Sequence, residues 1–409
     1  MSNSATERRK KLKFSEIETR DRLSDLSDCV ILHILLFLNA NDAVRTCVLS
    51  SRWKNLWKLL PELTLHSTGF QTCKIFTNFV SSTLSLRDPS IPLQALDFNL
   101  AKATGLLEPC ILNMIVNYAI SHNIRRLGLC FYSDFAKIPD TIFSCQTLTH
   151  LKLAIFPRRG HKTRFPESSN LPALTILQLE NLKFCAGDNG RAAEPFSTLN
   201  KLKSLLISNC TVYGTGTLCI SSATLVNLTL HNQFSNFYTI DLRTPSLCTF
   251  AFTGTPYQEL SGSDVSSLEH VEIYAEIIRY QREPPLILFN WLREFRNIKS
   301  LTVSATTLRI LYLIPNLLKI NFPSLGNLES LRVKMEPFSD EFRMTLCHVM
   351  LRKAKSKKES ANLRRTFREG LEPSSLIPDG IMDFLLQNSP TAKVDFIDCS
   401  RKPRRPTHL

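Results

Sequence analysis

Cysteine and histidine could support the widest range of chemistry in this chain, but their spacing matches neither a metal site nor a catalytic one. The twelve cysteines lie singly, at positions 29, 47, 73, 110, 130, 145, 185, 210, 219, 248, 347 and 399. There is no CxxC pair, and no cysteine–histidine group has zinc-ligand spacing. Isolated cysteines within apolar segments act as small hydrophobic residues, which suits a reducing compartment. We therefore expect no metal ion.

The common catalytic and phosphate-binding motifs are also missing. GxGxxG, GxxxxGK[ST], HExxH and GxSxG do not occur, and the 13 glycines offer few phosphate-binding loops. Acidic residues and histidines are dispersed along the chain. We predict a protein that is not itself an enzyme and that uses no cofactor.

The net charge of +14 comes largely from three basic clusters, at residues 8–13, 352–368 and 401–405. A basic chain suggests a nucleic-acid partner, but these clusters lack interleaved aromatic residues and match no known nucleic-acid-binding module. We interpret the clusters as solvated tails (1–20, disordered, and 401–409) and a charged helix face, with no nucleic acid expected.

A location in the nucleus or the cytoplasm is expected. The N-terminus lacks the apolar core of a signal peptide. The best apolar run, 30–38, is interrupted by His33 and is too short to cross a bilayer, so no membrane partner is expected.

Residues 21–60 have the pattern of three short amphipathic helices. Val30, Ile31, Ile34, Leu35 and Leu38 form one broad apolar face, with Ser27 as the N-cap. Asn41 or Asp42 can cap a second helix, and Ser50 a third that ends at Pro61. Three such helices bury too little surface to fold alone, so the unit needs a partner in this chain or another.

This segment resembles the F-box of plant F-box/leucine-rich-repeat proteins. The resemblance rests on the ordered blocks DRLSDL (21–26), ILLFL (34–38), DAVRT (42–46) and VLSSRWKNLW (48–57). It implies docking on a Skp-family adaptor, and through that adaptor on a cullin scaffold. Leu26-Ser27 stands where the family has Leu-Pro, and Cys29 where it has an apolar residue after the acidic one, which predicts weaker docking. The adaptor-binding residues it implies are Leu23, Leu26, Ser27, Ile31, Ile34, Leu35, Leu38, Val44, Val48, Leu49, Trp53 and Leu56.

A motif of the form LxxLxL recurs about ten times between residues 93 and 335. Its middle positions are 96, 127, 151, 177, 205, 228, 250, 271, 301 and 331, and most spacings fall within the 20–29 residues of leucine-rich repeats. Residues two apart share one face of a strand, so the last two apolar residues of each copy enter a core between stacked parallel strands. Helical patterns at 111–119 and 288–295 predict cover for the other face.

These patterns predict an α/β solenoid: the three-helix F-box, a helical connector (61–92), an irregular leucine-rich-repeat arc (93–335) and a C-terminal cap (336–400). The outward positions of the strands would bind an unknown protein substrate. The residues that we predict for this role are Ile176, Gln178, Leu206, Thr229, His231, His270, Tyr274 and Arg332.

The predicted function is that of the substrate-recognition adaptor of a Skp–cullin–F-box ubiquitin ligase. The alternative is a leucine-rich-repeat scaffold for protein binding whose F-box does not dock. Strong, salt-sensitive binding of RNA or DNA would instead favour a nucleic-acid binder.

Overall fold

The structure is a computed structural model that describes residues 25–399 except 102–104, 135–136, 159, 187–191, 215, 234–237, 263–264, 278–283, 323–324, 355 and 369–375. The expected basic tails, 1–20 and 401–409, and Leu23 lie outside the described residues. Among the residues that the structure describes, no helix combines the length and the apolar character that a membrane span requires.

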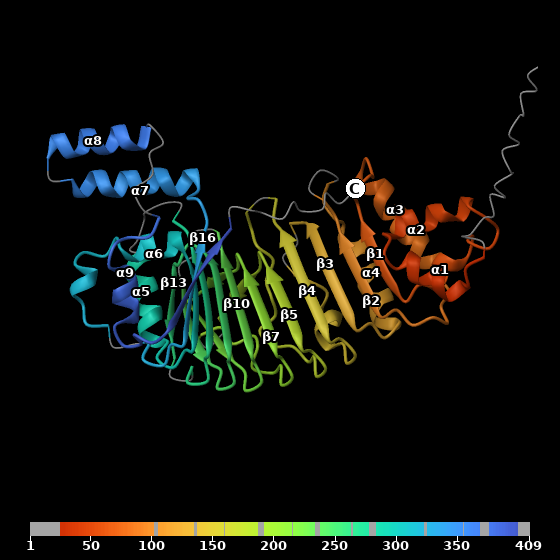
Figure 1. Cartoon of the computed structure of the whole chain (residues 1–409). Coiled ribbons are helices and arrows are strands. Elements are labelled where there is room, and N and C mark those ends of the chain that lie inside the picture. The colour runs from red at the N-terminus through yellow and green to blue at the C-terminus, as the bar shows by residue number, and fades with distance from the viewer. Residues whose placement is uncertain are drawn as a thin grey trace, which may run out of the picture.

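The N-terminal module contains two α-helices and two 3₁₀ segments, which lie beyond the first strand of the main sheet (Figure 1). They are α1 (Asp28–Leu35), α2 (Ala40–Arg45), η1 (Thr46–Val48) and η2 (Leu56–Leu59). The expected third α-helix is wrong: Trp53 N donates to Ser50 O and Leu60 N to Trp57 O, both three residues back. Trp53, Leu56, Trp57 and Leu60 are all buried, so the apolar residues of this segment enter the core although the backbone turns are the tighter three-residue kind.

The rest of the described chain forms a mostly parallel sheet with helices, compatible with an α/β repeat arc (Figure 1). The main sheet has twelve strands, each paired in parallel with the next. In order they are β1 (Glu62–His66), β2 (Ala95–Asn99), β3 (Arg126–Tyr132), β4 (His150–Phe156), β5 (Ile176–Glu180), β7 (Ser204–Ser208), β10 (Asn227–Asn232), β12 (Thr249–Gly254), β14 (His270–Ala275), β15 (Ser300–Ser304), β16 (Ser330–Met335) and β17 (Lys393–Asp398).

The two apolar positions of each LxxLxL motif form two continuous rows of the core. Leu177, for example, pairs with Leu151 on one side and Leu205 on the other. Leu179 pairs in the same way with Leu153 and Ile207, and all of these side chains are buried. Each strand thus covers the apolar side chains of its neighbours, as the repeat pattern predicts.

The connector between the module and the repeats begins with a strand, which the helical prediction for 61–92 missed. Strand β1 pairs in parallel with β2, and Leu63 lies beside Leu96 in the first core row. Leu60, Leu63 and Leu65 have the LxxLxL spacing, so the sequence did hold this signal. The predicted helix follows as α3 (Cys73–Leu86).

The connections between the strands of the main sheet change character along the chain. Helices α4 (Pro109–Ser121) and α5 (Pro284–Glu294) confirm the two helical patterns, accompanied by η4 (Asp140–Ser144), α6 (Ala305–Leu311) and η5 (Leu317–Lys319). In the connections between β5 and β14, short strands take the place of helices. A second parallel sheet joins β9 (Thr217–Ser221), β11 (Tyr238–Arg243) and β13 (Gln258–Ser261), and a third joins β6 (Lys183–Cys185) and β8 (Thr211–Tyr213).

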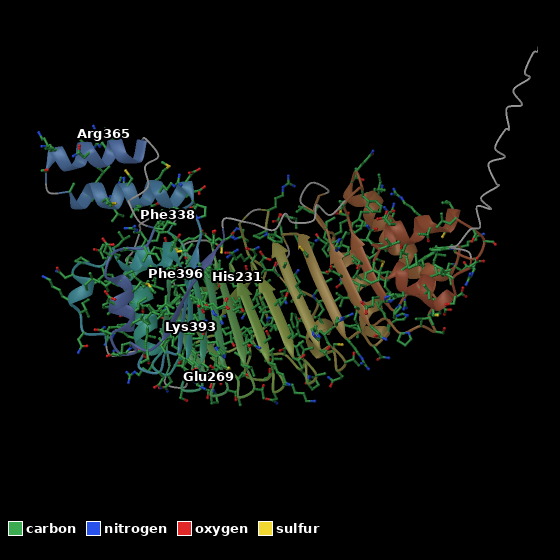
Figure 2. All side chains as sticks on the ribbon, in the orientation of Figure 1. His231, Glu269, Phe338, Arg365, Lys393 and Phe396 are labelled. Carbon is green, nitrogen blue, oxygen red and sulfur yellow. The ribbon has the colours of Figure 1, made fainter. Side chains whose placement is uncertain are left out.

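The C-terminal region holds α7 (Asp340–Lys353), α8 (Lys357–Arg368) and α9 (Ile381–Leu386) before strand β17. Strand β17 pairs in parallel with β16, so the region expected as a C-terminal cap ends in a strand that extends the sheet. Phe396 falls in the second core row, opposite Val333, yet it is 58% exposed because no further described strand covers it (Figure 2).

Candidate protein-binding surfaces

The N-terminal module buries one side of α1 and leaves the other open. Ile31 and Leu35 are fully buried, whereas Val30, Ile34 and Phe37 are 41%, 37% and 78% exposed. The latter three are spaced i, i+4, i+7 and therefore share one face of the helical segment. Apolar side chains are thus available to a partner along this face.

Two more apolar residues are exposed in the turn after α2. Val48 is 87% exposed and Leu49 is 56% exposed. We call Val30, Ile34, Phe37, Val48 and Leu49 together the docking residues. Val30 and Phe37 were not in the predicted adaptor-binding set, although their helical spacing from Ile34 is visible in the sequence.

The structure corrects four members of the predicted adaptor-binding set. Ile31, Leu35, Trp53 and Leu56 are at most 6% exposed, so they form the module's own core. The remaining members divide by exposure. Leu26, Leu38 and Val44 are partly buried against this core, and Ser27, Ile34, Val48 and Leu49 are exposed.

Capping and one ion pair set the orientation of α1 and α2. Ser27 occupies the N-cap position of α1 but makes no side-chain cap hydrogen bond; its Oγ lies 2.9 Å from Cys29 Sγ. For α2 the cap is Asn39, not Asn41 or Asp42, because Asn39 Oδ1 accepts a hydrogen bond from Asp42 N at 2.9 Å. Arg52 Nη2 lies 2.6 Å from Asp28 Oδ1 and so joins the turn between η1 and η2 to the start of α1.

The second candidate surface is the face of the main sheet that carries the outward side chains. All eight residues predicted to bind a substrate lie on this face. Gln178, Leu206 and Thr229 are neighbours across three adjacent strands. Arg332, on β16, is the most distant of the set. Seven strands from β5 to β16 span about 30 Å, so these eight residues do not form one compact site.

Two of the eight are restricted by their surroundings in the chain, Tyr274 by contacts and His231 by partial burial. Tyr274 donates a hydrogen bond to Glu272 Oε2 at 3.0 Å, and Lys334 Nζ lies 4.1 Å from the centre of its ring. The ring of Tyr274 is therefore covered on one side by a cation. His231 is half-buried, and burial lowers the pKa of its imidazole.

One group of possible metal ligands occurs among the described residues. The ligand atoms of Cys248, Glu269 and His270 lie within 4.8 Å of one another. Glu269 Oε1 is already ion-paired with Lys299 Nζ at 2.7 Å, and the side chain of His270 is 52% exposed. Because a lysine occupies the carboxylate, we interpret this group as a surface ion-pair cluster.

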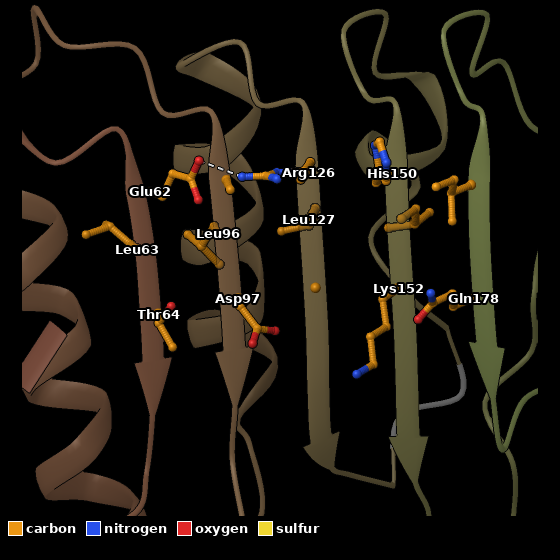
Figure 3. Close-up of a pocket in the computed structure, with 14 residues that line it drawn as sticks. Glu62, Leu63, Thr64, Leu96, Asp97, Arg126, Leu127, His150, Lys152 and Gln178 are labelled. Carbon is orange, nitrogen blue, oxygen red and sulfur yellow. Dashed lines mark ion pairs between the residues drawn. The ribbon is translucent and has the colours of Figure 1, made fainter. Parts of the chain in front are cut away.

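A hollow of about 350 Å³ lies on the outward face near the N-terminal module (Figure 3). Residues of five consecutive strands, β1 to β5, line it. Ile176 and Gln178, from the predicted set, lie at its β5 end, and Glu62 and Thr64 lie at its β1 end. Asp97 of β2 and Lys152 of β4 lie between them.

Burial and charge shift the pKa values of groups in and beside this hollow. Burial and the nearby Arg126 guanidinium lower the pKa of His150, which favours its neutral form. Burial raises the pKa of Glu180, an effect that Lys152 partly opposes. Glu62 and Arg126 neutralise each other in an ion pair of 2.6 Å. The hollow therefore presents both charges and hydrogen-bonding groups.

Comparisons with known proteins agree with the N-terminal module and with the repeats. The family model of the F-box domain matches residues 23–64. An Arabidopsis thaliana F-box/FBD/LRR-repeat protein is 28% identical over 361 residues, 80% of this chain and 72% of its own length. F-box/LRR-repeat protein 13 from the same plant is 35% identical over 176 residues, 42% of this chain and 37% of its own length. An FBD-associated F-box protein of Arabidopsis is 29% identical over 259 residues and is matched over 51% of its length.

Proposed function

Because the chain is a plant F-box/leucine-rich-repeat protein, we propose that it is the substrate-recognition adaptor of a Skp–cullin–F-box ubiquitin ligase. In this role the docking residues bind a Skp-family adaptor, and the outward face of the main sheet binds the target. Proteins of this family are typically non-catalytic. The contribution of this chain would be proximity, since a bound target has a raised effective concentration near the ubiquitin-charged enzyme.

The observation that carries the proposal is the exposure of apolar side chains inside the segment that matches the F-box. Phe37 and Val48 are 78% and 87% exposed, and both lie within residues 23–64. Exposed aromatic and aliphatic side chains of this kind become buried in protein interfaces, where a few of them supply most of the binding free energy. Each such residue is worth about 2 kcal/mol or more when it is central to an interface.

The test is co-purification with a Skp-family adaptor. The double variant Phe37→Asp/Val48→Asp should weaken adaptor binding at least tenfold, because it places two charges in an apolar interface. Phe396→Asp is the matched control: Phe396 is also an exposed phenylalanine but lies at the other end of the sheet. It should bind the adaptor as the unmodified chain does.

Adaptor binding that survives in the double variant would contradict the proposed docking residues. An unmodified chain that binds no Skp-family adaptor would instead favour the alternative, a repeat scaffold whose F-box does not dock. The nuclear or cytoplasmic location expected from the sequence stays a prediction.

A further inference from the structure

One residue that lines the hollow, Gly128 in the middle of strand β3, has no side chain. Gly128 is not in the left-handed backbone conformation, so the local backbone does not require glycine. A Cβ atom added to Gly128 would lie 2.5 Å from Asp97 Oδ1. The glycine therefore leaves room for the Asp97 carboxylate, and close approach of a neighbouring group is a common reason for glycine within a strand.

Two neighbouring rows of the outward face repeat one arrangement of an acid, a small residue and a base. In the first row Glu62, Ala95 and Arg126 lie side by side on β1, β2 and β3. Arg126 reaches across the alanine, and its Nη2 lies 2.6 Å from Glu62 Oε1. The two charged side chains of this row therefore form an ion pair with each other.

The second row has the same order of acid, small residue and base, but its acid and its base form no ion pair with each other. Asp97, Gly128 and Lys152 lie side by side on β2, β3 and β4. Asp97 Oδ2 interacts with His66 Nε2 at 3.1 Å, whereas Oδ1 faces the space over Gly128. Figure 3 shows the ion pair between Glu62 and Arg126 and no ion pair between Asp97 and the exposed Lys152. The row thus offers a hydrogen-bond acceptor and a donor on opposite sides of a glycine.

The shape of the hollow suits an extended polypeptide. Five strands about 4.8 Å apart give it a length of about 19 Å, which is the span of roughly six extended residues. A group that both donates and accepts hydrogen bonds fits between Asp97 and Lys152, and every peptide unit has an N–H and a C=O. Asp97 and the paired Glu62 would repel phosphate groups, and Arg126 is engaged by Glu62, so a nucleic acid or a phosphopeptide fits less well.

We propose that the hollow over β1–β5 binds an unmodified, extended segment of the target protein and places an amide group over Gly128, between Asp97 and Lys152. This inference rests on the proposed function, because it assigns the site at which the target is held. Asp97 accepts a hydrogen bond from the amide N–H, and Lys152 donates one to the amide oxygen. Ile176 supplies an apolar contact at the β5 end of the hollow.

The probe is a phage-displayed library of random linear 12-residue peptides, selected against the full chain. Selected peptides should lose at least tenfold in affinity for Lys152→Met and for Asp97→Asn. They should also bind poorly to Gly128→Val, in which the added side chain fills the hollow. The matched control is Lys203→Met, which removes an exposed lysine that lies outside the hollow and outside the predicted substrate-binding set, and which should leave affinity within twofold.

Peptides that bind all four variants equally, or a selection that gives no peptide whose binding depends on Lys152, overturn the proposal. Peptides rich in Asp or Glu that bind Asp97→Asn more tightly also overturn it, because they identify an anion site. Thermal unfolding of each variant checks its fold. Lys152→Met keeps the test decisive if Gly128→Val does not fold, since Lys152 is exposed. Adaptor co-purification, measured separately, reports on docking alone, so failure of the ligase proposal and failure of this site are distinguishable.

Discussion

The guanidinium of Arg87 donates two hydrogen bonds to the carbonyl oxygen of Leu60, at 2.9 and 3.1 Å. It also donates to the carbonyl oxygens of Ile91 and Pro92, at 2.7 and 3.0 Å. Arg87 is only 3% exposed, and Leu60 lies two residues before strand β1 begins at Glu62. One buried cation therefore holds the end of the N-terminal module against the segment that enters β2.

Replacing Arg87 by methionine should lower the free energy of unfolding by about 3 kcal/mol, because buried carbonyl groups lose their donors. Urea denaturation, followed by circular dichroism, measures this change. Arg125→Met is the control, since the Arg125 side chain is exposed, and its effect should stay within about 0.5 kcal/mol. Equal stabilities of the two variants would show that the hydrogen bonds of Arg87 contribute nothing net.

Trp53 and Phe37 should respond in opposite ways to truncation. Trp53 is 3% exposed and belongs to the module's core, so Trp53→Ala should cost about 3–5 kcal/mol of stability. Phe37 is 78% exposed, so Phe37→Ala should cost less than about 0.5 kcal/mol and should weaken adaptor binding instead. Denaturation midpoints and adaptor affinity, measured on both variants, separate the two effects. A Trp53→Ala variant that stays stable but binds the adaptor weakly would contradict the core assignment and show that Trp53 contributes to adaptor binding.

Two phenylalanines of the same core row allow a matched comparison along the sheet. Phe252 on β12 is fully buried between β10 and β14, whereas Phe396 on β17 is 58% exposed. Phe252→Ala should therefore cost about 3–5 kcal/mol, and Phe396→Ala less than about 1 kcal/mol. Chemical denaturation of both variants measures the difference. A large cost at Phe396 would mean that another segment covers it.

The pH dependence of stability should include a contribution from His231. Burial lowers the pKa of His231 in the folded chain, so the unfolded chain takes up a proton at a higher pH. Its contribution to stability is complete above the unfolded pKa, about 6.5, and declines as the pH falls below that value. His231→Gln should therefore lose less stability than the unmodified chain between pH 7.5 and 5.5. Asn227→Gln, at an exposed residue of the same strand that does not titrate, is the control and should keep the original slope.

The strands could be predicted from the sequence because their signal is local and repeated. Each LxxLxL copy identifies its own two core residues, and pairing then follows from stacking one copy on the next. Strand β1 escaped because Pro61 was interpreted as a helix stop, which obscured the same motif at Leu60, Leu63 and Leu65. The sequence did not predict the second sheet, β9–β11–β13, because its short strands lie within connections that have no repeated motif.

The binding surfaces were harder to predict, for a physical reason. Helix α1 is apolar on two faces, so periodicity alone cannot tell buried Ile31 from exposed Ile34. Buried Arg87 has no sequence signal, because arginine is ordinarily exposed. The hollow depends on which residues of β2 and β4 lie beside Gly128, and that is a property of strand register rather than of any single strand.

The in-register stacking of the main sheet also has an evolutionary consequence. Each strand aligns only with the strand before it and the strand after it, so the gain or loss of whole copies beyond β5 would leave the alignment of Asp97, Gly128 and Lys152 intact. Related genes can therefore diverge in length at the far end of the sheet while the part nearest the F-box keeps its geometry.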